Sequence, residues 1–391
     1  MGCWIVTLQG GPKRSNQAAV AIEHEIYSFG GCRCLRDDSN NQIIEIFGVH
    51  VLNTIDYRWK FVPAIPFEPN PSEQLIDELG IAYEPDGEMP SMRVGHTVVA
   101  YQGKAYMWGG YCPITNIMCS KIYCFDPEQK TWSVIPTASR TPSGRAKHTA
   151  IVYDSMMFIY GGMENDSVNN HTILWNDVWA YYFKTRRWYN INVHGQIPRE
   201  RFQHTACVID DKMYVYGGVD ANRRELYLDV LNLNQGHWER PNTRGQRPNG
   251  VRAACSWVHN KKMYIFGGCR NRDERYIATL HRFDPETLIW CKIEPFGLNG
   301  PMSRERHCGV LVGDCAYVFS GLSSIISFTE YIGFGCLIEM CDLNVLNHNW
   351  TLKDLAAIAV IRHRLNFVDS DELPLELRID LDMMITRNDV L

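Results

Sequence analysis

A short unit recurs along almost the whole chain, and this repetition constrains the fold more than any other feature. Each copy ends in an aromatic and aliphatic run followed by glycine. The copies are YSFGG ending at Gly31, YMWGG at Gly110, FIYGG at Gly162, YVYGG at Gly218, YIFGG at Gly268 and a degenerate YVFSG at Gly321. Successive endpoints are 79, 52, 56, 50 and 53 residues apart. A period of about 50 residues indicates supersecondary units that bury a continuous core only when they stack together.

The other marks of the unit also keep a fixed order. Before the glycines, an arginine and usually a histidine open a β-branched run, as in RVGHTVV from Arg93 and RAKHTAIV from Arg145. After the glycines, a strand and a polar turn lead to a tryptophan, as in IYCFDPEQKTW ending at Trp132. Trp59 and Trp350 are expected at the same place in the first and last copies. Alternating Val, Ile, Tyr and Phe suit half-buried strands, so each copy is predicted to form a four-stranded sheet.

A closed ring of such sheets buries the faces that a single sheet would expose. The period, the glycine pair and the tryptophan together resemble the kelch repeat, from about Arg14 to Trp350. This resemblance implies an all-β, six-bladed β-propeller. The N-terminal CWIVTLQG looks like the outer strand that normally follows the tryptophan. We therefore expect Trp4 to Leu8 to complete the sixth blade, which joins the two ends of the ring without a long free edge.

Two segments interrupt the period. The 79-residue interval holds an insertion, roughly residues 60–90, that is rich in Pro, Glu and Asp and is expected to form a long surface loop or a partner-contacting lid. The other segment is LSSIISFTEYIGFG after Gly321, which is apolar enough to fold over one face of the ring.

Composition narrows the classes of function. The chain has 391 residues, 45% of them hydrophobic, and a formal charge of −5 with no block of Lys or Arg, so nucleic acid is not expected as a direct partner. No run approaches the roughly 20 apolar residues of a membrane span, and the N-terminus has no secretory pattern. We expect a cytoplasmic and nuclear protein without a membrane partner. The 14 cysteines contain no CxxC pair, which favours buried reduced thiols and no metal or other cofactor.

The recurring histidines raise the question of catalysis. His96, His148 and His204 occupy the same place in successive copies, with His307 nearby, and could suggest a metal or acid–base site. A residue repeated in every blade is more often part of the scaffold, because a site needs one convergent set of groups. A copper-radical oxidase is the enzymatic alternative for this fold, but that class is secreted. No nucleophile-elbow, P-loop, HExxH or dinucleotide motif occurs, so a non-catalytic protein is expected.

The arginines point to a binding surface. Several precede the predicted inner strands and would converge on one face around the central channel: Arg93, Arg145, Arg201, Arg252 and Arg306, with Arg304 two residues before the last. Each could simply tie one blade to the next through backbone carbonyls. Together they could instead form a positive, partly desolvated bowl. Such a bowl suits a carboxylate, because guanidinium groups bind carboxylates with two parallel hydrogen bonds.

The tail departs from the β pattern. In TLKDLAAIAVI, one helical face carries Leu352, Leu355, Ala356, Ala359 and Val360, and a second stripe carries Ile358, Ile361 and Leu365. A helix that is apolar on two sides needs cover on both, from the propeller and from a partner. The alternative is a helix that plugs the base of the ring.

The last segment allows two secondary structures. Residues 375–383 alternate apolar and polar as a strand would, whereas Leu373, Leu377, Leu381 and Met384 form a helical face. Asp371 ahead of Pro374 suits the start of a helix, so we expect a helix.

The tail carries a second resemblance. Thr351, Leu352, Ala356 and Val360 match the elongin-binding box of cullin-RING substrate receptors, with Ala356 in place of the usual cysteine. In DELPLEL, the residues Leu373, Pro374 and Leu377 resemble the box that selects cullin-2. With GGPKRSNQAAVA, GDCAYVFSG and AAIAVIRHRL, the chain resembles the kelch-propeller substrate receptors of cullin-2 RING ubiquitin ligases.

This resemblance implies a division of labour and a set of partners. Residues 1–350 would form the propeller and residues 351–391 the two binding boxes. The implied partners are elongin B, elongin C, cullin-2 with its RING subunit, and the C-termini of substrates, typically ending in glycine. Arg252 and Arg304 match carboxylate-gripping positions of the family, and Arg201 and Arg306 would join them. The family's pattern has a serine and a tyrosine where Ala253 and Val94 stand here.

Overall fold

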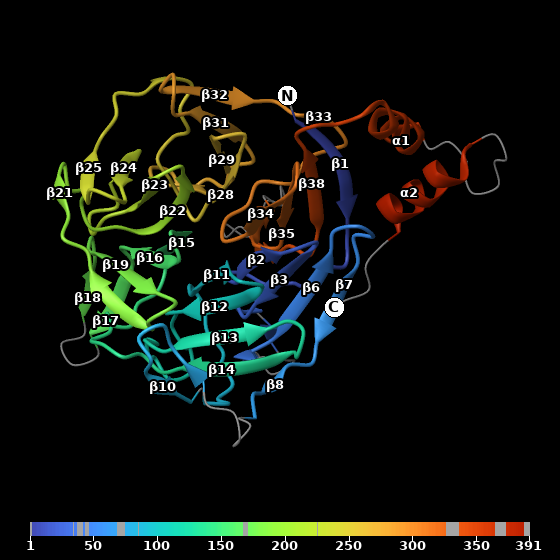
Figure 1. The fold of residues 1–391 in the computed structure, drawn as a ribbon. Helices are drawn as coiled ribbons and strands as arrows, with labels where there is room; N and C mark the ends of the chain where they lie inside the picture. The colour runs from blue at the N-terminus through green and yellow to red at the C-terminus, as the bar shows by residue number, and fades with distance from the viewer. Residues whose placement is uncertain are drawn as a thin grey trace.

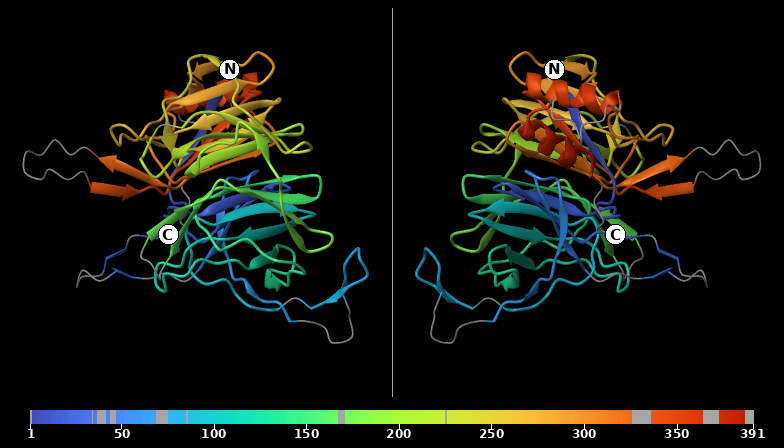
Figure 2. Two further views of the ribbon diagram at one scale, coloured as in Figure 1. Left: turned by 90° about the vertical axis from the view of Figure 1, so that its left-hand side faces the viewer. Right: turned by 90° about the vertical axis from the view of Figure 1, so that its right-hand side faces the viewer.

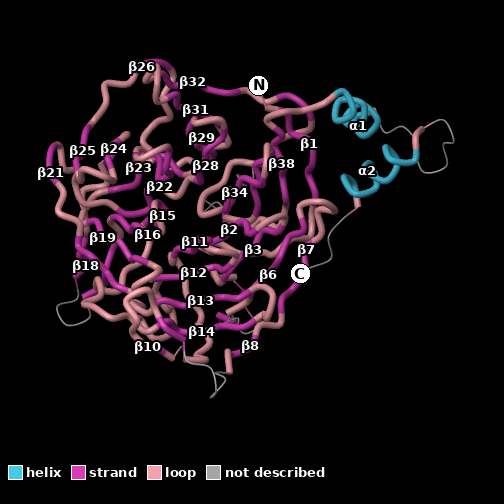
Figure 3. The backbone as a smooth tube through the Cα atoms, in the orientation of Figure 1, coloured by secondary structure: helices cyan, strands magenta, loops and turns pink. Residues whose placement is uncertain are grey.

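The chain folds as a six-bladed β-propeller with two short helices at its side, as predicted (Figure 1). The computed structural model describes residues 2–33, 35–36, 42–43, 47–68, 75–84, 86–166, 171–224, 226–325, 336–363 and 373–386. Strands dominate the ring, and the helices lie together at one edge of it (Figure 3).

Each blade is an antiparallel four-stranded sheet, and its first strand lies nearest the channel. From the channel outward, blade 1 has β2 (Ala18–Ile22), β3 (Glu25–Phe29), β6 (Val49–Asn53) and β7 (Trp59–Val62). Blade 2 has β11 (Thr97–Tyr101), β12 (Lys104–Trp108), β13 (Ile122–Asp126) and β14 (Thr131–Ile135). Blade 3 has β15 (Thr149–Tyr153), β16 (Met156–Tyr160), β19 (Val178–Tyr182) and β20 (Arg187–Asn190).

The second half of the ring repeats this order. Blade 4 has β22 (Phe202–Ile209), β23 (Lys212–Val219), β24 (Asp229–Asn232) and β25 (His237–Glu239). Blade 5 has β28 (Cys255–His259), β29 (Lys262–Phe266), β31 (Leu280–Asp284) and β32 (Ile289–Ile293). Blade 6 has β34 (Cys308–Val312), β35 (Cys315–Phe319), β38 (Leu343–Asn347) and β1 (Cys3–Leu8).

The ring closes through its N-terminal strand. β1 pairs antiparallel with β38, so the expectation for Trp4 to Leu8 is confirmed. Trp4 lies opposite Leu346, as Trp132 lies opposite Phe125 in blade 2. The sixth blade therefore takes its buried tryptophan from β1, and the expectation that Trp350 fills this place is wrong. Trp350 follows β38 and is 37% exposed, because the strand that would carry it comes from the other end of the chain.

The glycine pairs let neighbouring blades approach closely. Gly109 and Gly110 both have positive φ, and the amide of Gly110 donates to the carbonyl of Arg145 in blade 3 at 2.8 Å. A Cβ added to Gly109 would lie 2.5 Å from the ring of His148 and 2.7 Å from the Arg145 carbonyl oxygen. Only glycine fits such a contact without displacing the next blade.

Hairpins rise from the face of the ring at which the inner strands begin, which we call the entry face. They follow the second strand of their blades: β4 (Leu35–Arg36) with β5 (Gln42–Ile43), β17 (Met163–Asp166) with β18 (His171–Leu174), and β36 (Leu322–Ile325) with β37 (Cys336–Glu339). Beside them, β27 (Val251–Arg252) pairs with β30 (Cys269–Arg270). The β36–β37 hairpin, which holds the described part of the apolar segment after Gly321, projects away from the ring (Figure 2). Residues 326–335 of that segment lie outside the described residues.

The insertion of residues 60–90 runs along the rim in its described part. β8 (Ile65–Pro66) adds in parallel to β14, and β9 (Leu75–Ile76) forms a hairpin with β10 (Ala82–Tyr83). Asp77 binds Arg186 of blade 3 at 3.0 Å, and Tyr83 lies under that guanidinium group at 4.0 Å. Short strands join the outer edges of blades 4 to 6 in the same way: β21 (His194–Gly195), β26 (Arg244–Gly245) and β33 (Phe296–Gly297).

The first tail helix, α1 (Leu352–Arg362), begins at a complete capping box. The Thr351 hydroxyl accepts from the Asp354 amide at 3.2 Å, and the Asp354 carboxylate accepts from the Thr351 amide at 2.6 Å. Ala357, Ile358 and Val360 are buried in one apolar cluster with β1 and β38. The helix therefore packs on the outer side of blade 6 and does not plug the base of the ring (Figure 1).

The second tail helix, α2 (Leu375–Ile385), confirms the choice of helix over strand. Leu381 and Met384 are buried and Leu377 is partly buried in the same cluster, so the predicted apolar face is the one that packs. Its cap residue is Pro374, while Asp371 lies outside the described residues. Of the helices that the structure describes, neither has the length and apolar character needed to cross a membrane.

Candidate functional site

The segment that precedes each inner strand follows one backbone pattern in all six blades. Its second residue pairs with the residue after the glycine pair, as Val94 does with Tyr111 and Glu305 with Leu322. Its third residue is left-handed, with φ between 52° and 66°. The third residues are Asn16, Gly95, Lys147, Gln203, Ala253 and Arg306. All six line a cavity of about 130 Å³ where the blades meet at the entry face, which we call the channel mouth.

The predicted arginines fall on three different positions of this segment. Arg201 and Arg304 are first residues, Arg252 is a second residue and Arg306 is a third residue. The position of an arginine within the segment decides how far its side chain is exposed. The side chains of Arg201 and Arg304 are 0% exposed, whereas those of Arg252 and Arg306 are 17% and 33% exposed.

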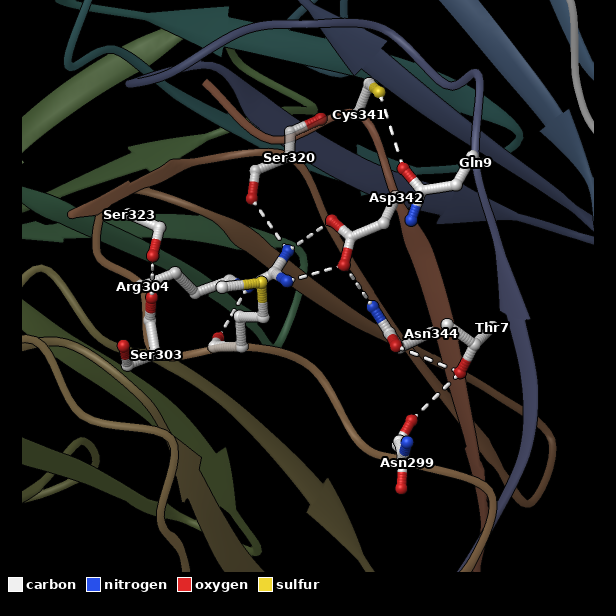
Figure 4. Close-up of polar contacts among 11 residues, drawn as sticks. Thr7, Gln9, Asn299, Ser303, Arg304, Ser320, Ser323, Cys341, Asp342 and Asn344 are labelled. Carbon is white, nitrogen blue, oxygen red and sulfur yellow. Dashed lines mark hydrogen bonds and ion pairs between the residues drawn. The ribbon is translucent and has the colours of Figure 1, made fainter. Parts of the chain in front are cut away.

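The prediction that Arg201 and Arg304 bind substrate is therefore not supported, because both side chains are fully buried. Arg304 donates to both carboxylate oxygens of Asp342, at 2.7 and 2.6 Å, and to the carbonyl oxygens of Met302 and Ser320 (Figure 4). Arg201 binds the carboxylate of Asp229 and two backbone carbonyls. Arg145 and Asp177 repeat the pairing in blade 3. These guanidinium groups are paired with a carboxylate and with backbone carbonyls inside their own blades, so their role is structural.

Three other cations lie in or beside the channel mouth: Lys147 and Arg306 line it, and Arg252 is next to them. The Nε atom of Arg306 lies 3.1 Å from one oxygen of Glu305, and the Nε atom of Arg252 lies 4.0 Å from the other. Arg252 also reaches Glu274 at 3.5 Å, and that carboxylate is 59% exposed. Lys147 faces them from blade 3, with its ammonium nitrogen 5.6 Å from the ring centre of Phe202.

The electrostatics of this cluster favour an anion. Burial lowers the pKa of Lys147, the charges of Arg306 and Arg252 lower it further, and Glu305 opposes them. Among the charged groups of this cluster, Lys147 and the two arginines face one buried carboxylate, Glu305, and one exposed carboxylate, Glu274. One oxygen of Glu305 is buried without a hydrogen bond. The mouth can thus hold a carboxylate against cations.

The recurring histidines join neighbouring blades. The Nε2 atom of His96 lies 3.1 Å from the carbonyl oxygen of Phe29, and those of His148 and His204 lie 2.8 and 2.9 Å from threonine hydroxyls of the preceding blades. Burial lowers the pKa of His96 and of His307 to about 3, so both rings stay neutral. Within the residues the structure describes, no three metal-binding side chains gather as a metal site requires.

Lys147 and Glu305 were missed by the sequence reasoning, although both lie in the segments that it singled out. The sequence feature that could have identified them is their distance from the histidine of the segment. Lys147 lies one residue before His148, and Glu305 lies two residues before His307. Val94 and Ala253, the two residues that depart from the family pattern, also lie in these segments. Val94 pairs through its backbone with Tyr111, and Ala253 contributes only a methyl group to the channel mouth.

The tail residues form a second candidate surface, away from the channel. Leu352 is 83% exposed at the first turn of α1, and Thr351 and Ala356 are also exposed. Val360 is buried against the propeller at 8% exposure. On the neighbouring segment Pro374 is exposed, while Leu373 and Leu377 are partly buried. Lys353 binds Asp380 at 2.5 Å, which holds the two helices together.

Comparisons with known proteins agree with the repeat structure. The family model described as the KLHDC2/KLHL20/DRC7 Kelch-repeats domain matches residues 95–321. Kelch domain-containing protein 3 of Rattus norvegicus is 33% identical over 399 residues, which covers 99% of this chain and 97% of the relative. The Homo sapiens protein of that name is 31% identical over 398 residues, with the same coverage.

A further match is partial. The leucine-zipper-like transcriptional regulator 1 homolog of Drosophila melanogaster is 32% identical over 241 residues, which covers 59% of this chain and 24% of the relative. The match to kelch domain-containing protein 3 extends beyond the repeats into the tail, since it covers nearly the full length of both chains. The chain therefore belongs to the family of kelch-repeat propeller proteins that includes kelch domain-containing protein 3.

Proposed function

We propose that the protein is the substrate-recognition subunit of a cullin-2, elongin B and elongin C RING ubiquitin ligase, and that it binds the free C-termini of substrates at the channel mouth. The observation that carries the proposal is the cluster of Lys147, Arg252 and Arg306, in which Lys147 and Arg306 line the channel mouth and Arg252 lies beside it. The role is recognition and positioning. Ubiquitin transfer would take place on other chains, in the cytoplasm and nucleus.

The chemistry of the mouth fits a terminal carboxylate. The two arginines offer planar groups that can each donate two hydrogen bonds, and Lys147 adds a third positive charge. The narrow cavity of about 130 Å³ favours a small last residue such as glycine. The hairpins of the entry face stand around this point and can contact the residues upstream of the terminus.

The tail supplies what docking to elongin needs. Leu352 extends into solvent from a helix whose first turn is fixed by the capping box. The buried side of α1 packs against the propeller through Ala357, Ile358 and Val360. An exposed leucine on a rigid helix loses little conformational entropy on binding, which favours its use as an anchor. Since Val360 is buried, elongin would contact the start of the box more than its end.

The proposal is tested by assembly and transfer. The full chain is combined with elongin B, elongin C, cullin-2 and the RING subunit, and a pool of reporter proteins with varied C-termini ending in glycine is added. We expect a stable complex that ubiquitylates a subset of the pool, and we expect that subset to be lost with Arg252→Ala. If no complex forms, the protein is a kelch scaffold without a ligase, and the exposed Leu352 is then not a docking residue.

A further inference from the structure

Blade 2 breaks the pattern of buried arginine and aspartate pairs. Arg93 is the first residue of its segment and is 3% exposed, like Arg145 and Arg304. In blades 3 and 6, the residue just before the third strand is an aspartate that binds this arginine. In blade 2 that residue is Lys121, since β13 begins at Ile122. No ion pair joins Arg93 to any carboxylate that the structure describes.

The guanidinium group of Arg93 is only partly satisfied. Its Nε atom donates to the carbonyl oxygen of Ser91 at 3.1 Å, Nη2 to the Ser91 hydroxyl at 3.3 Å, and Nη1 to the carbonyl oxygen of Gly109 at 3.5 Å. Its carbon Cζ lies 4.7 Å from the ring centre of Tyr123. A guanidinium group has five N–H donors, so two of them have no acceptor among the described residues. The positive charge itself is not neutralised by direct contact with a described carboxylate.

The neighbouring carboxylate is already engaged elsewhere. Glu88 pairs with Lys121 and accepts the Tyr123 hydroxyl at 2.6 Å. These two hydrogen bonds, together with the positive charges of Lys121 and Arg93, hold the pKa of Glu88 below its usual value against the effect of burial. Glu88 therefore remains ionised and forms its ion pair with Lys121. Arg93 is left without a carboxylate partner among the described residues.

A cavity opens beside this arginine. It has a volume of about 370 Å³ and lies between the second and third strands of blade 2 and the end of the insertion, and we call it the blade-2 cavity. Arg93, Lys121, Glu88 and two serines supply polar groups, with the Glu88 carboxylate paired to Lys121, while Cys112, Ile117 and Met118 make one wall apolar. It shares no lining residue with the channel mouth. A pocket with one buried cation and an apolar wall selects an acid that carries a hydrocarbon stem.

We propose that the blade-2 cavity is a second ligand site, which binds a carboxylate on an apolar stem and pairs it with Arg93. The ligand carboxylate takes the place that Asp177 and Asp342 fill in their blades, and Lys121, which pairs with Glu88, lies at the rim. The stem lies along Ile117 and Met118. The source of the carboxylate is either a small monocarboxylic acid or the side chain of a glutamate in a bound peptide.

The test exchanges the charges at the cavity. The double variant Glu88→Lys with Lys121→Asp keeps an ion pair between the two positions but gives Arg93 the aspartate that blades 3 and 6 have at this place. We expect the free variant to melt at a higher temperature than the wild type, because its buried cation now has an internal partner. We also expect it to lose the saturable rise in Tm that butyrate gives to the wild-type full chain. Butyramide, which has the same shape without the charge, should give no rise in either protein.

Two further proteins complete the experiment. The swap of Glu78→Lys with Lys184→Glu reverses an exposed pair at 3.0 Å on another part of the rim and should respond to butyrate like the wild type. If the swap at Glu88 and Lys121 does not fold, Lys121→Gln replaces it. That half-exposed lysine should be dispensable for folding, and its loss should weaken butyrate binding roughly fivefold.

The outcomes separate clearly. An equal butyrate response in the wild type and the Glu88–Lys121 variants, or no response in the wild type, would overturn the proposal, since any carboxylate would then bind elsewhere or not at all. A second arm compares the blocked peptides acetyl-Ala-Glu-Ala-amide and acetyl-Ala-Gln-Ala-amide. A response to the glutamate peptide alone assigns the site to protein side chains, and a stronger response to butyrate assigns it to small acids. Neither peptide has a free C-terminus, so the channel mouth is not tested by this arm.

Discussion

The guanidinium group of Arg304 and the carboxylate of Asp342 form two parallel hydrogen bonds of 2.7 and 2.6 Å inside blade 6 (Figure 4). The contact does not end there. Asn344 donates to Asp342 at 2.8 Å, and its own oxygen accepts from the hydroxyl of Thr7 at 3.2 Å. Thr7 lies on the N-terminal strand, so this network links the segment before the inner strand of blade 6 to the strand that closes the ring.

Replacing Arg304 by alanine should destabilise the propeller. The change leaves the Asp342 carboxylate buried without its partner, and the loss of one member of a buried ion pair typically costs about 3–5 kcal/mol. Urea denaturation of the full chain measures the change in the free energy of unfolding. Arg306→Ala is the matched comparison, because that side chain is one third exposed and its partner Glu305 keeps Arg252 at 4.0 Å, so its loss should cost less than the loss of Arg304. Equal losses for both variants would contradict the division of the arginines into structural and binding groups.

The buried histidines predict a loss of stability in acid. Burial holds the pKa of His96 and His307 at about 3 and that of His148 and His204 well below 6.5. As the pH falls below about 6.5, these histidines bind protons in the unfolded chain but not in the folded chain. Stability contributed by each histidine is therefore present above pH 6.5 and is lost toward the folded pKa, at about 1.4 kcal/mol per pH unit.

The variant His148→Gln isolates one of these groups. Gln17 occupies the same position in blade 1, so glutamine fits the backbone there. Between pH 6.5 and 5, the free energy of unfolding of the variant should fall less steeply than that of the wild type, by about 1.4 kcal/mol per pH unit. Parallel curves for the two proteins would show that His148 does not remain neutral in the fold.

The exposed leucine of α1 should decide elongin binding. Leu352→Ser removes a side chain that is 83% exposed and contributes little to the fold, so the melting temperature should be almost unchanged. If Leu352 becomes buried in elongin, its loss should weaken the complex by about 1.5–3 kcal/mol, which is roughly tenfold to a hundredfold in Kd. Surface plasmon resonance with the elongin B and C complex measures this change.

Leu79→Ser serves as the control, because Leu79 is also an exposed leucine, 53% exposed, and lies on the rim insertion away from α1. It should bind elongin like the wild type. A Leu352→Ser protein that binds as tightly as the control would reject docking through the start of α1.

Much of the fold could be predicted because the repeat leaves few choices. Glycine pairs, β-branched runs and tryptophans at a fixed period indicate one blade per copy, and the spare strand at the N-terminus closes the ring. The place of Trp350 was the error at this level. The repeat order suggested a sixth buried tryptophan there, but closure brings Trp4 into that position from the other end of the chain.

The site was harder to predict, because a backbone conformation decides which side chains reach the channel. The third residue of each segment is left-handed, a conformation usually read from glycine. In this chain it is held by Asn, Gly, Lys, Gln, Ala and Arg, so the sequence carries no consistent sign of it. Without that register, buried Arg304 and accessible Arg306 look equivalent, and Lys147 is overlooked.

The tail shows the same limit. The sequence predicted two apolar stripes on the first helix. In the structure Ile358 of the second stripe is buried and Leu352 of the first is exposed, while Leu365 lies outside the described residues. Which stripe meets the propeller depends on the surface of blade 6, which local periodicity does not describe. For this reason Val360, grouped with Leu352 in the predicted elongin box, is instead buried against β1 and β38.

The central claim is that the channel mouth recognises a free C-terminal carboxylate. Two pools of random hexapeptides ending in glycine, one with free and one with amidated C-termini, are passed over the immobilised full chain, and retained peptides are measured by mass spectrometry. We predict that peptides are retained from the free pool only. We also predict that Arg252→Ala or Arg306→Ala weakens the binding of these peptides roughly tenfold to a hundredfold in Kd, as expected for the loss of a charged hydrogen bond. Equal retention of amidated and free peptides would contradict the account.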